Sequence, residues 1–194
     1  MARRSAQLDL LNERNYKIRF GGSLLKNSHP KVKRDLLPHL PIHLVLRSTK
    51  ATGHWNLLRY NKRIHSIVLK MAHRYHIKLR KLANSGNHLH IIIELRSKDS
   101  FAPFIKAISS WIVREVTGAW RGNPLLREFS ASKESAFWTG RPFTRIGTYG
   151  SDSKRQIHYL NLNKVEAKTG LKRPAARALL AILERSDQIL LLSG

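Results

Sequence analysis

Two histidines separated by a single leucine open an apolar, β-branched stretch of the chain. His88 and His90 stand in the run 87–94, which reads NHLHIIIE. Side chains alternate along a strand, so both imidazoles share one face, and at about 3.3 Å per residue their Cα atoms lie roughly 7 Å apart. Ring nitrogens at that separation can bind one ion together. The pattern predicts a metal site on the open face of a sheet, with partly exposed strand histidines as the ordinary alternative.

A tyrosine and an asparagine four residues apart supply a second set of reactive groups. The run 156–163, QIHYLNLN, is expected to be helical, so Tyr159 and Asn163 project from the same side of the helix. Together with His88 and His90 they would provide two nitrogen ligands, one oxygen ligand and a candidate nucleophile. Such a set leaves metal positions open for a substrate.

This combination of motifs resembles the single-tyrosine HUH endonucleases. Within them it is most similar to the REP-associated tyrosine transposases and their insertion-sequence relatives. The likeness runs from about Ile42 to Ala167 and includes Phe137-Trp138 ahead of a basic stretch that ends Phe143-Thr144-Arg145. Lys164 stands where these proteins often have proline, and the first strand, 43–47, matches only loosely.

The resemblance implies a specific chemistry on DNA. Mg²⁺ or Mn²⁺, held by His88, His90 and Asn163, would polarise a phosphodiester that Tyr159 attacks, giving a 5′-phosphotyrosine and a free 3′-OH. The tyrosine must be activated, because ionising a phenol of pKa near 10 at neutral pH costs about 4 kcal/mol. The covalent bond keeps the energy of the phosphodiester, so strands rejoin without ATP. The implied partner is single-stranded DNA with a hairpin, such as a REP-like or transposon-end sequence.

Composition limits the class of protein. The 194 residues carry 36 Lys and Arg against 12 Asp and Glu, a net charge of +24 that favours a polyanion such as nucleic acid. No stretch approaches the roughly 18 apolar residues of a membrane-spanning helix. The start of the sequence is polar, so we expect a cytoplasmic, nucleoid-associated protein. With no cysteine present, disulfides and thiolate metal sites are excluded.

The hydrophobic pattern predicts an α+β fold. Strands at 42–47, 77–84, 88–95 and within 136–146 alternate with helices at 60–75 and 101–120 and with the Tyr159 helix after 151–153. This order suits an antiparallel sheet with helices on one face, the split βαβ arrangement of ferredoxin-like or RRM-like palms. We predict a basic N-terminal arm at 1–38, the endonuclease domain at 39–169 and a helical C-terminal tail at 170–194.

Basic residues interleaved with aromatic ones mark a candidate DNA surface. Arg141 and Arg145 are expected to contact single-stranded DNA, while Trp138 is expected to be mostly buried. Arg47, at the end of the first predicted strand, is the third candidate contact. Among the other tyrosines, Tyr149 is the rival nucleophile, but no ligand-type residue follows it by four positions.

Other functions remain open from the sequence alone. A non-catalytic, domesticated DNA- or RNA-binding protein would also be basic with a split βαβ sheet, and would need neither Tyr159 nor metal. A replication or relaxase-type HUH enzyme shares the chemistry but is usually larger. A metal-dependent hydrolase is disfavoured because no acidic cluster lies near the histidines. The chain is expected to be a monomer or a homodimer.

Overall fold

The fold is built on one antiparallel sheet. The structure is a computed structural model that describes residues 20–21, 34, 36–119, 136–147 and 150–185. The strands lie in the order β1-β5-β2-β4-β3, and every neighbouring pair is antiparallel. Their bounds are β1 Phe20–Gly21, β2 Pro41–Arg47, β3 Ile77–Asn84, β4 His88–Leu95 and β5 Phe143–Ile146.

The strand that carries the histidine pair lies inside the sheet. β4 lies between β2 and β3, and a short turn at 85–87 joins β3 to β4, with Gly86 at φ +86° and Ser85 N–H donating to the His88 carbonyl at 2.9 Å. A positive φ favours glycine at this turn. The chain order of strand, helix, strand, strand, helix and strand confirms the predicted split βαβ arrangement.

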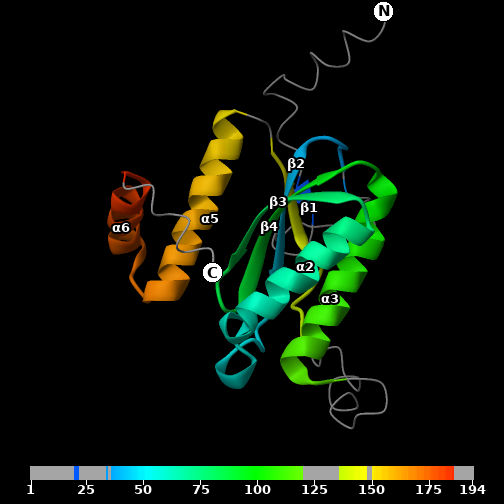
Figure 1. Cartoon of the computed structure of the whole chain (residues 1–194), viewed down its shortest axis with the longest axis horizontal. Helices are drawn as coiled ribbons and strands as arrows, with labels where there is room; N and C mark the ends of the chain where they lie inside the picture. Colours follow the sequence, from blue (N-terminus) through cyan, green and yellow to red (C-terminus); the bar gives the residue numbers. More distant parts are fainter. Residues whose placement is uncertain (1–19, 22–33, 35, 120–135, 148–149, 186–194) are drawn as a thin grey trace, which may run out of the picture.

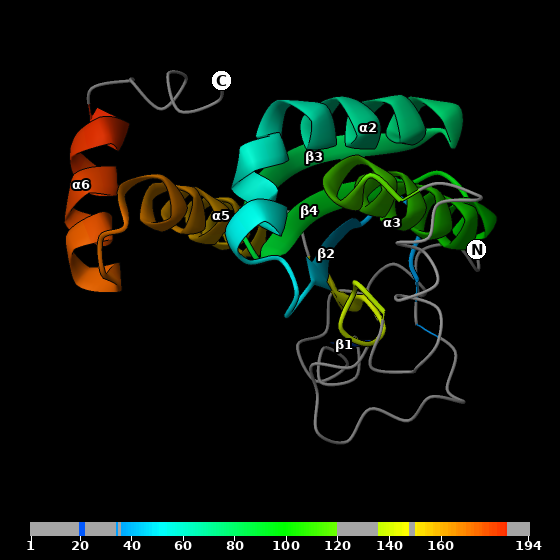
Figure 2. The ribbon, with the colours of Figure 1, turned by 90° about the horizontal axis from the view of Figure 1, so that it is seen from below.

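Two amphipathic helices cover one face of the sheet. Helix α2, Asn61–Arg74, and helix α3, Phe101–Thr117, both lie on the same side of it (Figure 2). Their apolar stripes meet the alternate β4 residues that face away from the histidines, and this layer is the main core. The fully buried side chains in it include Ile64, Val68, Phe104, Ile108, Ile112, Leu89, Ile91 and Ile93.

A third helix lies against the opposite face, where the sequence predicted helices on one face only. Helix α5, Ser151–Thr169, lies across the sheet from α2 and α3 (Figure 1). It buries Leu160 against Ala83 and Ile92 of the sheet. Burial of these apolar side chains keeps α5 on the sheet. Helix α6, Arg173–Arg185, packs on α5 through a small cluster of its own: Leu162, Val165, Ala176 and Leu180.

Several element bounds differ from those predicted. The extended segment at 136–146 pairs as a strand only from Phe143, and Phe137 and Trp138 precede it as irregular chain packed on the core. The N-terminal arm contains β1, which pairs with β5. Tyr149 and the apolar run 189–192 lie outside the described residues. None of the described helices is long and apolar enough to cross a membrane.

Candidate active site

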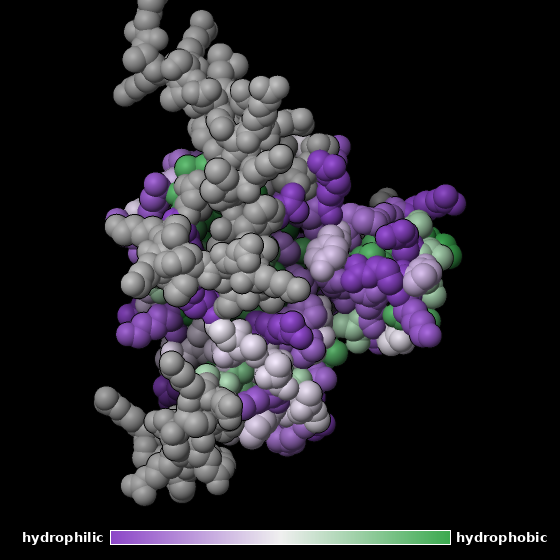
Figure 3. All heavy atoms as spheres, turned by 180° about the vertical axis from the view of Figure 1, so that it is seen from behind, coloured by the Kyte–Doolittle hydropathy of each residue, from purple (hydrophilic) through white to green (hydrophobic). Residues whose placement is uncertain are grey.

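The predicted histidine pair lies at the beginning of β4, an inner strand of the sheet. His88 is half-buried and His90 is only 3% exposed, and their ring centroids are 4.6 Å apart. Because β4 is paired on both sides, its backbone is held rigidly and both rings keep the face set by strand alternation. The pair therefore forms one compact group on the side of the sheet opposite the main core. Seen from behind the view of Figure 1, the coloured surface is mainly hydrophilic, with small hydrophobic areas (Figure 3).

Helix α5 brings the other two predicted site residues to this pair. The Tyr159 ring meets His90 edge-on with centroids 5.6 Å apart, and Asn163 Nδ2 lies 3.1 Å from His90 Nε2. Asn163 is buried, whereas Tyr159 is 42% exposed. The four-residue spacing thus places both side chains toward His90, as the helical interpretation predicts.

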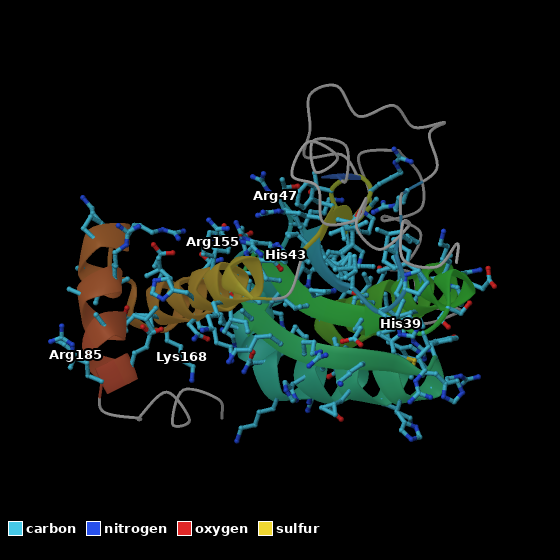
Figure 4. All side chains as sticks on the ribbon, turned by 90° about the horizontal axis from the view of Figure 1, so that it is seen from above. His39, His43, Arg47, Arg155, Lys168 and Arg185 are labelled. Atoms are coloured by element: carbon cyan, nitrogen blue, oxygen red, sulfur yellow. The ribbon has the colours of Figure 1, made fainter. Side chains whose placement is uncertain are left out.

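A third histidine, which sequence reasoning did not select, completes the group. His43 of β2 is buried, and its Nε2 lies 3.0 Å from His90 Nδ1. It shares the sheet face of the β4 pair and lies toward α5, whereas His39 lies toward the other end of the sheet (Figure 4). The available signal was the alternation in the run 42–47, where one histidine stands between apolar residues that face the core.

A chain of hydrogen bonds runs through the site in one direction. Arg173 can only donate, so its Nη2 donates to Asn163 Oδ1 at 3.1 Å. The Asn163 amide N–H then points to His90 Nε2, which must accept and carries a lone pair. His90 Nδ1 accordingly bears the proton and donates to His43 Nε2. Arg173 therefore fixes the tautomer of His90 through Asn163.

The imidazoles are held in their neutral forms. Burial, and then the charge of Arg145, lowers the pKa of His43 to about 4. Burial is also the main reason that the pKa of His90 lies far below its usual value, and the neighbouring His43 lowers it further. The pKa of His88 is lowered as well, first by burial. Neutral imidazole is the form that binds a metal.

The donor set fits a divalent ion bound through imidazole nitrogens. His88 Nδ1 lies 2.5 Å from Asn87 Oδ1 and donates to it, so its Nε2 carries the lone pair, as in His90. A polar partner on the second nitrogen is typical of metal-binding histidines. Among the described residues no three His, Asp or Glu side chains form a metal-holding group, so an ion here would need amide or water ligands besides. In this structure Asn163 presents its Nδ2–H to His90 Nε2 and its Oδ1 to Arg173, so the amide would have to turn over to offer its oxygen to an ion.

Two of the three predicted DNA-binding arginines flank the histidines. Arg47 is the Cα partner of His88, and Arg145 is the Cα partner of His43. Residues directly opposite in a sheet share a face, so both arginines lie on the histidine face. Arg47 is exposed and Arg145 is half-buried. This face therefore combines neutral imidazoles with cationic groups that suit a phosphate backbone.

The third arginine, Arg141, belongs to a different part of the surface. It is exposed, and its charge, after burial, lowers the pKa of Arg34, which donates to the Pro142 carbonyl at 2.6 Å. Nearby Trp138 is half-buried and donates through Nε1 to the Ser109 carbonyl at 3.1 Å. Trp138 is thus tied to the core, in line with the expected burial.

Comparisons with known proteins identify the family to which the chain belongs. A family model described as "Transposase IS200 like" matches residues 37–160, well over half of the chain. No curated protein matches. A solved REP-associated tyrosine transposase bound to a REP hairpin is similar in fold, with a TM-score of 0.54, 12% identity, and coverage of 71% of this chain and 74% of that one. A structure from Deinococcus radiodurans R1, provisionally described as a transposase, matches with a TM-score of 0.41, 18% identity, and coverage of 66% and 93%. With the histidine strand and Tyr159 inside the matched residues, the chain belongs to the IS200-like transposase family.

Proposed function

We propose that this protein cuts and rejoins single-stranded DNA through a covalent tyrosine intermediate. The Tyr159 oxygen attacks the phosphorus of a phosphodiester and its proton passes to water. The bond from phosphorus to the 3′ oxygen breaks, and that oxygen takes up a proton to become a free 3′-OH. A 3′-OH attacks the resulting 5′-phosphotyrosine in reverse, which reforms a phosphodiester and releases the tyrosine without ATP.

The observation that carries this proposal is the position of the Tyr159 ring beside His90 and His43. Its ring lies edge-on to His90 and 42% exposed, so the phenol is open to a DNA strand while it faces the candidate metal ligands of the same chain. A purely structural tyrosine would have no need of two buried, neutral imidazoles beside it. The placement supports a nucleophile, which must reach substrate and cation together.

His88 and His90 would hold Mg²⁺ or Mn²⁺ through Nε2, with Asn163 beside them. When bound, such an ion polarises the scissile phosphate and neutralises developing charge. His43 keeps the His90 ring and tautomer in place, and Arg47 and Arg145 would hold the neighbouring phosphates. Divalent metal use agrees with membership of a transposase family.

The proposed substrate is a single strand next to a hairpin. The similar solved transposase was bound to a REP hairpin, which supports a hairpin ligand here. Positive charge on the histidine face suits a strand whose phosphates lie along the sheet. The alternative is a non-catalytic nucleic-acid-binding protein that keeps this fold and charge without cleavage.

End-labelled DNA tests the proposal directly. A hairpin-containing single strand is incubated with protein and Mn²⁺ and run on a denaturing gel. Label on the 3′ end should migrate with the protein, because the 5′-phosphotyrosine joins the downstream fragment, whereas label on the 5′ end should appear in a short free fragment. Label in the protein band from the 5′ end instead would contradict the polarity, and no protein-linked label at all would favour the non-catalytic alternative.

A further inference from the structure

Helix α6 carries an arginine into the active site. Arg173 is the first residue of α6, and its guanidinium carbon lies 5.4 Å from the centroid of the Tyr159 ring. Its Nη2 donates to Asn163 Oδ1 at 3.1 Å, and its Nε lies 2.8 Å from Glu166 Oε1. The arginine therefore touches both predicted site residues of α5. It lies beyond residues 37–160, which the family model matches.

These contacts hold the guanidinium in a fixed orientation. Glu166 binds one edge of the planar group and Asn163 another, while the cation lies over the Tyr159 ring in the manner of a cation–π contact. The side chain of Arg173 is nevertheless 42% exposed, and arginine has five N–H groups, so further donors remain for a ligand. A charge fixed in place beside the nucleophile loses little entropy when it binds an anion.

We propose that Arg173 binds the phosphate group that becomes attached to Tyr159. This inference rests on the proposed function. As the bond from the Tyr159 oxygen to phosphorus forms and the bond to the 3′ oxygen breaks, the non-bridging oxygens keep their negative charge throughout. Arg173 donates N–H groups to those oxygens and transfers no proton, and it keeps this contact in the 5′-phosphotyrosine. The guanidinium fork suits phosphate oxygens better than an ammonium does.

The other cations of the site are placed for different phosphates. Arg47 and Arg145 lie opposite His88 and His43 on the strands, on the sheet side of the site. Arg173 approaches from α6 and contacts the tyrosine helix itself. Because α6 packs on α5 through its own cluster, the nucleophile and this arginine belong to one two-helix unit and would keep their relative positions.

A neutral phosphate analogue provides the decisive test. Single-turnover adduct formation is measured for the wild type, Arg173→Gln, Arg173→Lys and the control Arg177→Gln, with saturating DNA carrying either a normal or a methylphosphonate linkage at the scissile position. Arg177 lies one turn further along α6, is exposed and makes the same charge change. On normal DNA we expect Arg173→Gln to slow the reaction roughly ten-fold or more, Arg173→Lys to recover part of the rate, and Arg177→Gln to match the wild type.

The methylphosphonate distinguishes phosphate binding from a structural role. Its scissile linkage has no charge for Arg173 to bind, so the defect of Arg173→Gln should shrink or vanish on this DNA. An unchanged or faster rate for Arg173→Gln on normal DNA, or an equal defect on both linkages, would overturn the inference while leaving the proposed function intact. Absence of any adduct in the wild type on normal DNA would overturn the proposed function and this inference with it.

Binding gives a second readout that needs no cleavage. In the Tyr159→Phe background, oligonucleotides that begin with a 5′-phosphate imitate the downstream product, and those with a 5′-OH are their controls. Tighter binding of the 5′-phosphate should be lost in Arg173→Gln and kept in Arg177→Gln. A preference that survives Arg173→Gln would count against the arginine as the phosphate ligand.

Discussion

At the scale of single residues, the hydroxyl of Tyr159 is the atom on which the proposed chemistry depends. Tyr159→Phe removes the attacking oxygen but keeps the ring that lies against His90. We expect loss of the covalent adduct, with DNA affinity unchanged within a few-fold, measured by denaturing gel and by fluorescence anisotropy. Tyr149→Phe is the control and should cleave normally. Adduct formation by Tyr159→Phe would show that another residue is the nucleophile.

The two strand histidines should matter more for metal binding than the asparagine does. His88→Ala and His90→Ala each remove an imidazole with its Nε2 lone pair, so both should abolish cleavage and weaken Mn²⁺ binding in calorimetry. Asn163→Ala should weaken it less, because water replaces an amide oxygen. Mn²⁺ binding that is unchanged in both histidine variants would show the pair to be structural.

Burial of His43 predicts a particular dependence of stability on pH. The pKa of His43 is about 4 in the folded protein and near 6.5 when unfolded, so between these values the unfolded chain binds more protons. Stability should therefore fall as the pH drops from 6.5 toward 4, by about 3 kcal/mol for this one group. His43→Gln should flatten that part of a denaturant-unfolding series. An equally steep loss in His43→Gln would assign the effect to other groups.

The sequence revealed the site residues that lie close together along the chain, and it missed those that only the folding of distant segments brings to the site. His88 with His90, and Tyr159 with Asn163, are related by strand and helix periodicity, which spacing alone exposes. His43 reaches His90 only because β2 and β4 pair in one register, and Arg173 reaches Asn163 only because α6 folds back on α5. Neither the contact of His43 with His90 nor that of Arg173 with Asn163 produces a periodic pattern in the sequence.

At the scale of elements, one leucine keeps the tyrosine helix on the sheet. Leu160 is fully buried with Ala83 and Ile92 in a cluster separate from the main core. Leu160→Ala should weaken the attachment of α5 by roughly 2–5 kcal/mol. Cleavage should then fall far more than overall stability in thermal unfolding does, because the core between the sheet and α2 and α3 is untouched.

A control substitution on α5 separates the loss of its contact with the sheet from a change in its helix propensity. Ile157 is 38% exposed, three residues before Leu160, and Ile157→Ala should leave cleavage near the wild-type rate. If Leu160→Ala cleaves as fast as Ile157→Ala, α5 does not depend on this contact. The sequence placed α5 at the right residues but could not show which face of the sheet it covers, because its sequence has no wide apolar stripe.

At the scale of the whole molecule, DNA binding and DNA cleavage should differ in the forms of DNA that they accept. With a net charge of +24, the protein is expected to bind duplex and single strands alike at low salt, but to cleave only single strands beside a hairpin. The steepness of the log–log salt dependence for single strands should decrease by about 0.7 for each phosphate that the protein no longer neutralises. Arg47→Gln and Arg145→Gln should each show this change.

The matched control for that series lies on the opposite side of the sheet. Arg74, in the last turn of α2, is exposed and belongs to the helix layer that faces away from the histidines, so Arg74→Gln should leave the slope of single-strand binding unchanged. Equal cleavage of hairpin single strand and perfect duplex at matched salt would reject the single-strand assignment. Equal slopes in all three variants would instead show that the histidine face does not carry the DNA.

The short strand β1 changes what removal of the N-terminal arm would do. Phe20 and Gly21 pair with Arg145 and Thr144, so they occupy the outer backbone hydrogen-bonding side of β5, whose other side is paired with β2. An uncovered strand edge is a template for self-association. Deletion of residues 1–19 removes five Lys and Arg and two acidic residues and leaves β1 in place. Deletion through residue 38 also bares β5, so aggregation, visible by light scattering, should set in between these two truncations.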